Sequence, residues 1–253
     1  MIDLHAHILP SIDDGASSDS EALAMVRAAA ADGIRMIAAT PHHNNGIYTN
    51  TSGSIIEGVT RLNALIKQQD IPVTVIPGQE VRFNDRFWEE HRLGHVQSLN
   101  GSRYLLVELP SSIVPRNFAD TVHELVVSGI VPVIAHPERN AEIAANPDKL
   151  KELVQLGAIG QLTTHSLCGL FGRKIRKLSL ELIRQQLVHI LASDAHDIAR
   201  RTFNLSEAYE VLRKEAGQRH VGFFQRNAEI IMENGEIIIP RSIPIRKNRF
   251  LWW

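Results

Sequence analysis

Cysteine is nearly absent from this chain of 253 residues, and so are the features of exported and membrane proteins. The single cysteine, Cys168, has no partner for a disulfide within the chain, which is typical of proteins in reducing compartments. No uninterrupted apolar stretch approaches the roughly 18 residues that a membrane-spanning helix needs. A strand-like segment at 2–7 begins at once and leaves no room for a secretory signal. We therefore expect a cytoplasmic protein with no transmembrane segment.

A large net charge is also lacking, because 27 lysine and arginine residues face 28 aspartate and glutamate residues, giving a formal net charge of −1. We therefore do not expect a nucleic-acid partner, which would need a broad basic surface. A chain of this length can bury roughly 70–75% of the surface that it exposes when unfolded, enough for one core without disulfides. Because no linker-like segment divides the sequence, we expect a single domain at 1–240 and a basic-aromatic tail at 241–253.

Short apolar runs alternate with longer segments of helical spacing, such as 118–127. This alternation is typical of βαβ units and of a parallel sheet. Seven runs at spacings near 30 residues predict an α/β fold, namely a distorted seven-stranded β/α barrel of the TIM-like type. The predicted strands are Met1–Leu4, Arg35–Ala39, Val73–Ile76, Tyr104–Val107, Val131–Ala135, Ala158–Leu162 and Val188–Ala192.

The first helix has recognisable start and stop signals. Ser18 and Glu21 have the spacing of a capping box, in which each side chain bonds a backbone donor near the other. Gly33 suits the left-handed conformation that ends many helices. We expect this helix from about Asp19 to Asp32.

Histidine, by contrast, is abundant, with 12 residues, and several of them directly follow the apolar runs. The runs lead into DLHAH, ATPHH, PGQE, VELP, AHPER, QLTTH and ASDAH. In β/α barrels the C-terminal ends of the strands converge on one mouth, where active sites are found. We therefore expect side chains that are far apart in sequence to line one site.

The spacing within two of these motifs indicates metal ligation. His5 and His7 are two residues apart on a strand, so their rings point to the same face. Asp194 and His196 repeat that geometry on the last strand. A single motif of this kind is often structural, but recurrence at the same end of successive strands favours a shared site.

The other strand ends add further ligands. His42 and His43 are adjacent and should point in opposite directions, and we take His42 as the ligand. Glu80, Glu108 and His136 each supply one more strand end. Imidazoles and carboxylates without thiolates suit Mn, Fe or Zn, and the number of carboxylates favours Mn²⁺. Because one ion cannot use so many ligands, we expect a centre of two or three metals with one bridging carboxylate.

At these motifs the sequence resembles the polymerase-and-histidinol-phosphatase (PHP) superfamily of metal-dependent phosphoesterases. More narrowly, it is similar to the bacterial manganese-dependent protein-tyrosine phosphatases of capsule and exopolysaccharide operons. The resemblance covers residues 1 to about 240, and HILPSIDDG and SLCGLFG point to the tyrosine-phosphatase branch. It implies a PHP-type barrel that hydrolyses phosphotyrosine on a protein substrate, a bacterial tyrosine kinase that controls capsule or exopolysaccharide synthesis.

The resemblance also implies three metal positions and a pair of phosphate-binding arginines. The metal ligands would be His5, His7, Glu80 and Asp194 for the first ion, Glu80, Glu108 and His136 for the second, and Asp14, His42 and His196 for the third. Arg139, in HPER, and Arg201 fall where the family positions arginines for the substrate phosphate. Arg200 is adjacent, so the second assignment rests on an ungapped count from Asp194.

Several alternatives stay open. The other route to tyrosine dephosphorylation uses a low-pKa cysteine in a loop that an arginine closes after five intervening residues. Cys168 and Arg173 are one residue too close for that motif, so we expect a cysteine without a catalytic role. A related enzyme acting on a small phosphomonoester such as histidinol phosphate would share the metals and differ in loops such as 44–55. A nuclease of the same superfamily is disfavoured by the charge balance.

From a different class, the chain would be a metal-stabilised scaffold that binds a kinase without hydrolysing phosphate. The full ligand set and the two arginines argue against this, since a scaffold needs no phosphate clamp. The segment 241–253, with its terminal tryptophans, could contact a partner, a second subunit or a membrane surface. We favour a disordered or self-packed tail.

Overall fold

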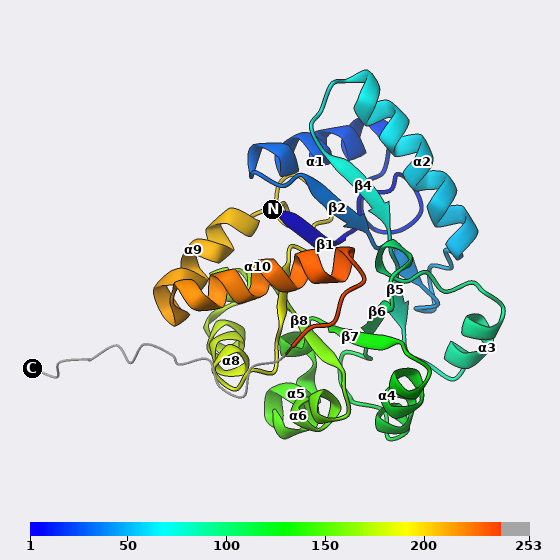
Figure 1. Cartoon of the computed structure of the whole chain (residues 1–253). Helices are drawn as coiled ribbons and strands as arrows, with labels where there is room; N and C mark the ends of the chain where they lie inside the picture. The colour runs from blue at the N-terminus through cyan, green and yellow to red at the C-terminus, as the bar shows by residue number, and fades with distance from the viewer. Residues whose placement is uncertain (239–253) are drawn as a thin grey trace, which may run out of the picture.

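The computed structural model describes residues 1–238, and within this range parallel strands alternate with helices (Figure 1). The tail predicted at 241–253 lies outside the described residues. The strands form one sheet in the order β1-β2-β4 and a second in the order β3-β5-β6-β7-β8-β9. Their bounds are β1 Ile2–Ala6, β2 Met36–Ala39, β3 His42–His43, β4 Thr74–Pro77, β5 Glu80–Arg82, β6 Tyr104–Glu108, β7 Val131–Ala135, β8 Ile159–Thr163 and β9 Ile190–Ala192.

The parallel α/β architecture is confirmed, but the prediction of seven strands in one barrel is not. Each of the seven predicted runs contains or overlaps a strand, and the additional strands are β3 and β5, which closely follow β2 and β4. Proline at 41, which has no N–H to donate, lies in the gap between β2 and β3. Gly78 lies in the gap between β4 and β5, where a Cβ would come within 2.9 Å of the Leu99 side chain. Each of these two chain segments thus contributes a strand to both sheets.

The described strands do not close into a continuous hydrogen-bonded ring. β1 meets the segment after β9 through an isolated bridge between Ala6 and Ala195. Two backbone hydrogen bonds of 2.8 Å flank it, from His7 N to Ala195 O and from Asp194 N to His5 O. The register of β1 against β2 is also irregular between Asp3 and Ala6. Such irregularities change the direction of side chains, and this one includes His5 and ends directly before His7.

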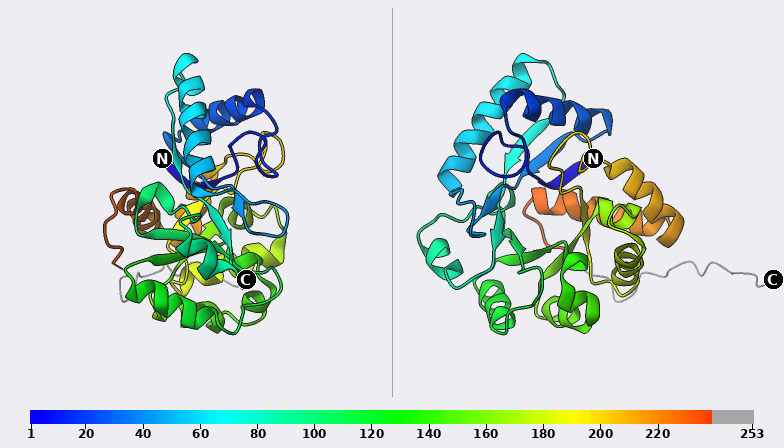
Figure 2. Two further views of the ribbon diagram at one scale, coloured as in Figure 1. Left: turned by 90° about the vertical axis from the view of Figure 1, so that its right-hand side faces the viewer. Right: turned by 180° about the vertical axis from the view of Figure 1, so that it is seen from behind.

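Helices cover the outer faces of both sheets. Figures 1 and 2 show α1 and α2 beside the three-stranded sheet and α4, α5 and α6 beside the six-stranded sheet. No helix among residues 1–238 is both long and apolar enough to cross a membrane. The helices are α1 Asp19–Ala31, α2 Ser52–Gln68, α3 Phe87–Arg92, α4 Phe118–Val127, α5 Ala141–Ala145, α6 Asp148–Gln155, α7 Thr164–Cys168, α8 Arg173–Arg184, α9 Leu205–Ala216 and α10 Gln218–Met232, with short 3₁₀ turns η1 Leu99–Gly101 and η2 Pro137–Arg139.

The start of α1 confirms the predicted cap and refines it. Ser18 accepts a hydrogen bond from Glu21 N at 3.2 Å. The Glu21 carboxylate accepts from the backbone and hydroxyl of Ser17, at 2.8 and 2.6 Å, rather than from Ser18 N. Gly33 has a φ of +86°, as expected for a left-handed stop. α4 has the bounds of the predicted helical segment.

The apolar core separates the two ends of the strands. The larger part lies between the strands and the outer helices. A smaller cluster fills the interior near the strand starts, where Leu4, Leu106 and Val133 pack with Ala228 and Ile231 of α10. The polar strand ends therefore gather on the opposite side, above an apolar base.

Candidate active site

The structure brings all nine predicted metal ligands together at the C-terminal ends of the strands. Every member of the cluster has a nitrogen or carboxylate oxygen within 4.0 Å of another member. The ligands are His5, His7, Asp14, His42, Glu80, Glu108, His136, Asp194 and His196. Most are buried, whereas Asp14 is exposed at the rim.

The group predicted for the first metal is compact. Nε2 of His5 and Nε2 of His7 lie 3.3 Å apart. Glu80 Oε2 is 3.4 and 3.3 Å from these two nitrogens, and Asp194 Oδ1 is 3.4 Å from each. Two imidazole nitrogens and two carboxylate oxygens thus face one small volume.

The group predicted for the third metal gathers around Asp14. Its Oδ1 lies 3.4 Å from His42 Nε2 and 3.5 Å from His196 Nε2. His7 also belongs to this group, since one ligand atom from each of the four residues falls within 4.8 Å of the others. The exposed IDDG turn therefore reaches the buried strand ends.

The group predicted for the second metal is arranged less regularly. His136 Nε2 lies 2.7 Å from Glu80 Oε1, the oxygen opposite to the one that faces His5 and His7. Glu108 has a ligand atom within 4.8 Å of ligand atoms of Glu80 and His42. Glu108 Oε2 also accepts a hydrogen bond from Arg82 Nε at 2.8 Å. Glu80 has the position of a bridging carboxylate, with one oxygen toward each side.

Asp13 fixes the ring of His7 and was missed by the sequence reasoning. Its Oδ2 lies 2.7 Å from His7 Nδ1 and accepts from His42 N at 3.2 Å, while Oδ1 accepts from Gly15 N at 3.0 Å. Because an ionised carboxylate only accepts, Nδ1 of His7 carries the proton and Nε2 keeps its lone pair for the site. The two adjacent aspartates of IDDG therefore have different contacts. Asp13 holds the His7 ring from behind, and Asp14 faces His42 and His196.

Gln161 and a backbone carbonyl orient two further imidazoles in the same way. Gln161 Nε2 donates to Leu162 O at 2.9 Å, which turns Oε1 toward His5 Nδ1 at 3.0 Å. His196 Nδ1 lies 2.9 Å from the carbonyl of Asp194. Both rings therefore present an Nε2 lone pair to the cluster. A polar residue within an otherwise apolar strand was the sequence signal for Gln161.

The donor set fits divalent metal ions. Glu80 Oε2 and His42 Nδ1 lie 2.9 Å apart, yet neither has a partner in hydrogen-bonding geometry among the described residues. Unpaired buried polar atoms are costly, so atoms that converge in this way favour a shared cation. Nitrogen and carboxylate donors without thiolates suit Mn, Fe or Zn.

The two predicted arginines also reach the site. Arg139 Nη1 and Arg201 Nη2 both donate to Oδ2 of Asp194, whose Oδ1 faces the histidines. The guanidinium of Arg139 lies 5.5 Å from the centre of the Phe171 ring. Arg200 is exposed, so of the two adjacent arginines Arg201 is the better candidate for the substrate phosphate. Nε of Arg201 is buried without a hydrogen-bond partner among the described residues.

The surrounding charges set the protonation of the cluster. Burial alone would raise the pKa of Asp194, but His5 and the two arginines hold that pKa well below its usual range. Burial and the charge of Arg139 lower the pKa of His136 to about 4. That ring is therefore neutral at neutral pH, the form that binds metals. Burial and the neighbouring Glu80 raise the pKa of Glu108 to about 7.

Two of the candidate ligands have a strained backbone. His136 has a φ of +33° and Asp194 a φ of +56°, in the left-handed region that non-glycine residues rarely adopt. Strained conformations of this kind cluster at functional sites, where the surrounding structure holds them. Hydrogen bonding of Asp194 N to His5 O is part of that support.

Two other residues of the motifs lie outside the cluster. His43 points away from His42, as predicted, and its Nε2 lies 3.4 Å from Glu90. Burial raises the pKa of the Cys168 thiol to about 12, so the reactive thiolate is disfavoured. This argues against the cysteine mechanism.

Comparison with known proteins identifies relatives over the whole chain. Residues 1–239 match the family model described as "Capsular polysaccharide synthesis, CpsB/CapC". Tyrosine-protein phosphatase YwqE of Bacillus subtilis (strain 168) is 42% identical over 249 residues, 98% of each chain. The putative tyrosine-protein phosphatase CapC of Staphylococcus aureus is 35% identical over 253 residues, which cover 100% of this chain and 98% of CapC.

Solved structures support the same relationship. A structure from a study of YwqE from Bacillus subtilis and CpsB from Streptococcus pneumoniae, described as unique metal-dependent tyrosine phosphatases, has a TM-score of 0.93 and 42% identity. The match covers 98% of this chain and 100% of that one. A histidinol phosphate phosphatase from Lactococcus lactis shares the fold at a TM-score of 0.58 and 14% identity, covering 88% and 94% of the chains. The chain therefore belongs to the CpsB/CapC family of capsular polysaccharide synthesis proteins.

Proposed function

We propose that this chain is a manganese-dependent protein-tyrosine phosphatase. Its substrate is phosphotyrosine on a bacterial tyrosine kinase that controls capsule or exopolysaccharide synthesis. The observation that carries the proposal is the convergence of nine metal-ligand side chains beside two arginines that share Asp194 Oδ2. The names of the relatives YwqE and CapC support the choice of substrate. Residues 1–240 act as one phosphatase domain.

The three ligand groups would hold two or three divalent ions, with Mn²⁺ proposed and Fe or Zn as alternatives. The first group is His5, His7, Glu80 and Asp194, the second is Glu80, Glu108 and His136, and the third is Asp14, His42 and His196. When bound, such ions supply positive charge to the phosphoryl oxygens and make water a stronger nucleophile at neutral pH. Asp13 and Gln161 keep the imidazole lone pairs directed at the ions.

Arg139 and Arg201 bind the phosphate. A phosphate monoester is a dianion near neutral pH, and a guanidinium binds two of its oxygens through parallel N–H donors. Asp194 holds both arginines on one carboxylate oxygen and thereby orients them toward the same volume. Their charge also offsets the negative charge that builds up in the transition state.

The leaving group needs little help from the protein. A tyrosine phenol has a pKa of about 10, far below that of an alkyl alcohol, so its oxygen leaves without full protonation. For that reason we assign no general acid. The demands on this chain are then to gather positive charge, orient the phosphate and hold a nucleophile in line with the scissile bond.

The test compares three substrates with the purified protein after metal analysis. Turnover of a phosphotyrosine peptide, histidinol phosphate and single-stranded DNA is measured with Mn²⁺ and with a chelator. We expect Mn²⁺-dependent hydrolysis of the peptide alone, a loss of at least 100-fold in kcat/KM for Arg201→Ala, and little change for the matched Arg200→Ala. Preferred hydrolysis of histidinol phosphate would contradict the substrate, and no turnover by metal-loaded protein would favour the scaffold.

A further inference from the structure

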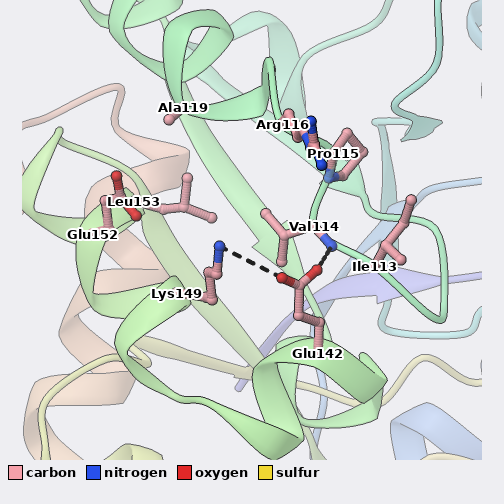
Figure 3. Close-up of a pocket in the computed structure, with 9 residues that line it drawn as sticks. All are labelled: Ile113, Val114, Pro115, Arg116, Ala119, Glu142, Lys149, Glu152 and Leu153. Carbon is pink, nitrogen blue, oxygen red and sulfur yellow. Dashed lines mark hydrogen bonds and ion pairs between the residues drawn. The ribbon is translucent and has the colours of Figure 1, made fainter.

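A pocket of about 500 Å³ is lined by none of the nine candidate ligands and has no part in the chemistry described above (Figure 3). It is formed by the loop between β6 and α4, the first turn of α4, and helices α5 and α6. Its volume is within the range of protein pockets that bind small ligands, roughly 300–1,000 Å³. Its wall includes Ile113, Val114, Arg116, Glu142, Lys149 and Leu153.

One loop connects the pocket to the site of phosphate chemistry. Ser111 lines a smaller pocket, of about 60 Å³, together with Glu108, His136 and Arg139. Ile113 is two residues further along the same loop, at most about 7 Å from Ser111 along the chain. An extended peptide whose phosphotyrosine reaches Arg139 therefore passes the mouth of the larger pocket within a few residues.

The shared loop is held in place from below. Asn140, which also lines the smaller pocket, donates through Nδ2 to Pro110 O at 2.8 Å and to Ile113 O at 2.9 Å. Ala141 N donates to Ser111 O at 2.8 Å. A wall fixed at three carbonyls keeps the two pockets at a constant spacing, as recognition of a flanking residue requires.

The polar groups of the pocket are largely paired with each other. Figure 3 shows the carboxylate of Glu142 between Val114 N, at 2.7 Å, and Lys149 Nζ, at 3.5 Å. Arg116 is exposed and makes no ion pair with any residue in the range 1–238. What remains for a ligand is an apolar surface from Ile113, Val114 and Leu153, with a free guanidinium at its edge.

Two cations and two carboxylates line the pocket, so its net charge is zero. Lys149 is paired with Glu142, which leaves Arg116 as the cation of the wall for an acidic residue of a ligand. The positive ends of α4 and α6 are offset by an aspartate in the first turn of each helix. Ile113 is 51% exposed and adds an accessible apolar side chain to the wall of the pocket.

We propose that this pocket binds an apolar side chain of the substrate protein located two to four residues from the phosphotyrosine, with an acidic neighbour paired to Arg116. The inference rests on the proposed phosphatase function and adds a sequence preference to it. At about 3.5 Å per residue, that separation spans about 7–14 Å, and its lower end equals the largest distance that the chain allows between Ser111 and Ile113.

The test measures kcat and KM with phosphotyrosine peptides in which a single leucine is moved through positions −4 to +4. Ile113→Asp is compared with Val127→Asp, which makes the same change at a 74% exposed residue at the far end of α4. We expect one favoured leucine position and an increase in KM of about tenfold for that peptide in Ile113→Asp, with kcat unchanged. Val127→Asp should match the wild type. When a glutamate is added beside the favoured leucine, KM should fall for the wild type, and Arg116→Glu should abolish that decrease.

A second substrate separates this inference from the proposed function. p-Nitrophenyl phosphate has no flanking residues, so its turnover should be equal in all of these proteins. A flat leucine scan, or equal KM values for Ile113→Asp and Val127→Asp, would overturn the pocket assignment while leaving the phosphatase intact. If the metal-loaded wild type hydrolyses neither substrate, the proposed function fails. In that case the pocket is tested by binding alone, through the fluorescence anisotropy of a labelled peptide. Equal affinity of the wild type and Ile113→Asp for that peptide overturns the pocket assignment.

Discussion

Replacing Asp13 by asparagine should weaken metal binding although Asp13 touches no metal. The carboxylate accepts three hydrogen bonds, from His7 Nδ1, His42 N and Gly15 N. Asparagine has a single acceptor oxygen, so one side of the group must turn an N–H toward another donor. If that side faces His7, the ring takes the other tautomer and loses its Nε2 lone pair. If it faces Gly15, it displaces the turn that carries Asp14.

The magnitude follows from these contacts. Each orientation leaves at least one buried donor unsatisfied, which costs about 1–3 kcal/mol. Changes to a group that orients a metal-binding histidine typically lower metal affinity or activity about 10–100-fold. We therefore expect metal affinity to fall by that factor, equivalent to about 1.4–2.7 kcal/mol of binding free energy.

The assay is a calorimetric titration of the metal-free protein with Mn²⁺, which gives the metal affinity. Turnover of a phosphotyrosine peptide is measured at the same Mn²⁺ concentrations. Asp32→Asn is the matched control. Asp32 also accepts from two backbone N–H groups, Leu205 N at 2.7 Å and Ser206 N at 3.2 Å, but it contacts no histidine. It should lower the melting temperature without changing metal affinity.

One outcome would refute the reasoning. If Asp13→Asn bound Mn²⁺ as tightly as the wild type and lost only thermal stability, like Asp32→Asn, the carboxylate would be a structural cap of the turn. A loss of metal affinity that Asp13→Glu partly restores would support the positioning role, because glutamate keeps two acceptor oxygens.

Three further changes test other parts of the structure. In Gly15→Ala the new Cβ would lie 1.9 Å from His7 O, so the turn must move and Mn²⁺-dependent kcat should fall about 100-fold, as single-turnover kinetics would show. Cys168→Ser should keep kcat/KM within about twofold, and a loss comparable to that of Arg201→Ala would revive the cysteine mechanism. Burial lowers the pKa of His189 to about 4, below its unfolded value near 6.5, so the unfolded state binds more protons and stability falls as pH drops from 6.5 toward 4. His189→Gln should remove about 2 kcal/mol of the loss between pH 7 and pH 5, measured by urea unfolding, and equal losses in both proteins would contradict this.

The site was more predictable than the fold that carries it. Ligands at strand ends can be recognised because apolar runs are followed at once by His, Asp or Glu, and parallel strands align those ends. The opposite directions of His42 and His43 follow from the pleat alone. Asp14 and Arg201 lie on loops and Arg139 ends the short turn η2. Local patterns do not specify the path of such segments, and only the family resemblance suggested these residues.

The additional strands and the supporting residues depend on tertiary packing. β3 consists of His42 and His43, too short a run for any periodicity to reveal. It forms because Thr40 turns toward β1, where its N and Oγ1 bond the backbone of Ala6 at 2.9 and 3.0 Å. Gln161 gains a role only because β8 lies where its amide meets His5, 156 residues away in sequence. Contacts of that range are not encoded in local spacing.

Asp194 couples the two halves of the site. Oδ1 faces the imidazoles of His5 and His7, and Oδ2 receives both arginines, so one carboxyl group fixes the candidate metal ligands and the proposed phosphate-binding arginines relative to each other. A carboxyl group is rigid and planar, so these arginines cannot shift without turning the oxygen that faces the histidines. The left-handed backbone of Asp194 is the conformation in which both oxygens meet their partners, and the strain at that residue is the cost of joining the two functions. The near-neutral composition of the chain therefore gives no hint of the local charge, which comes from five carboxylates and three guanidiniums in and around the cluster.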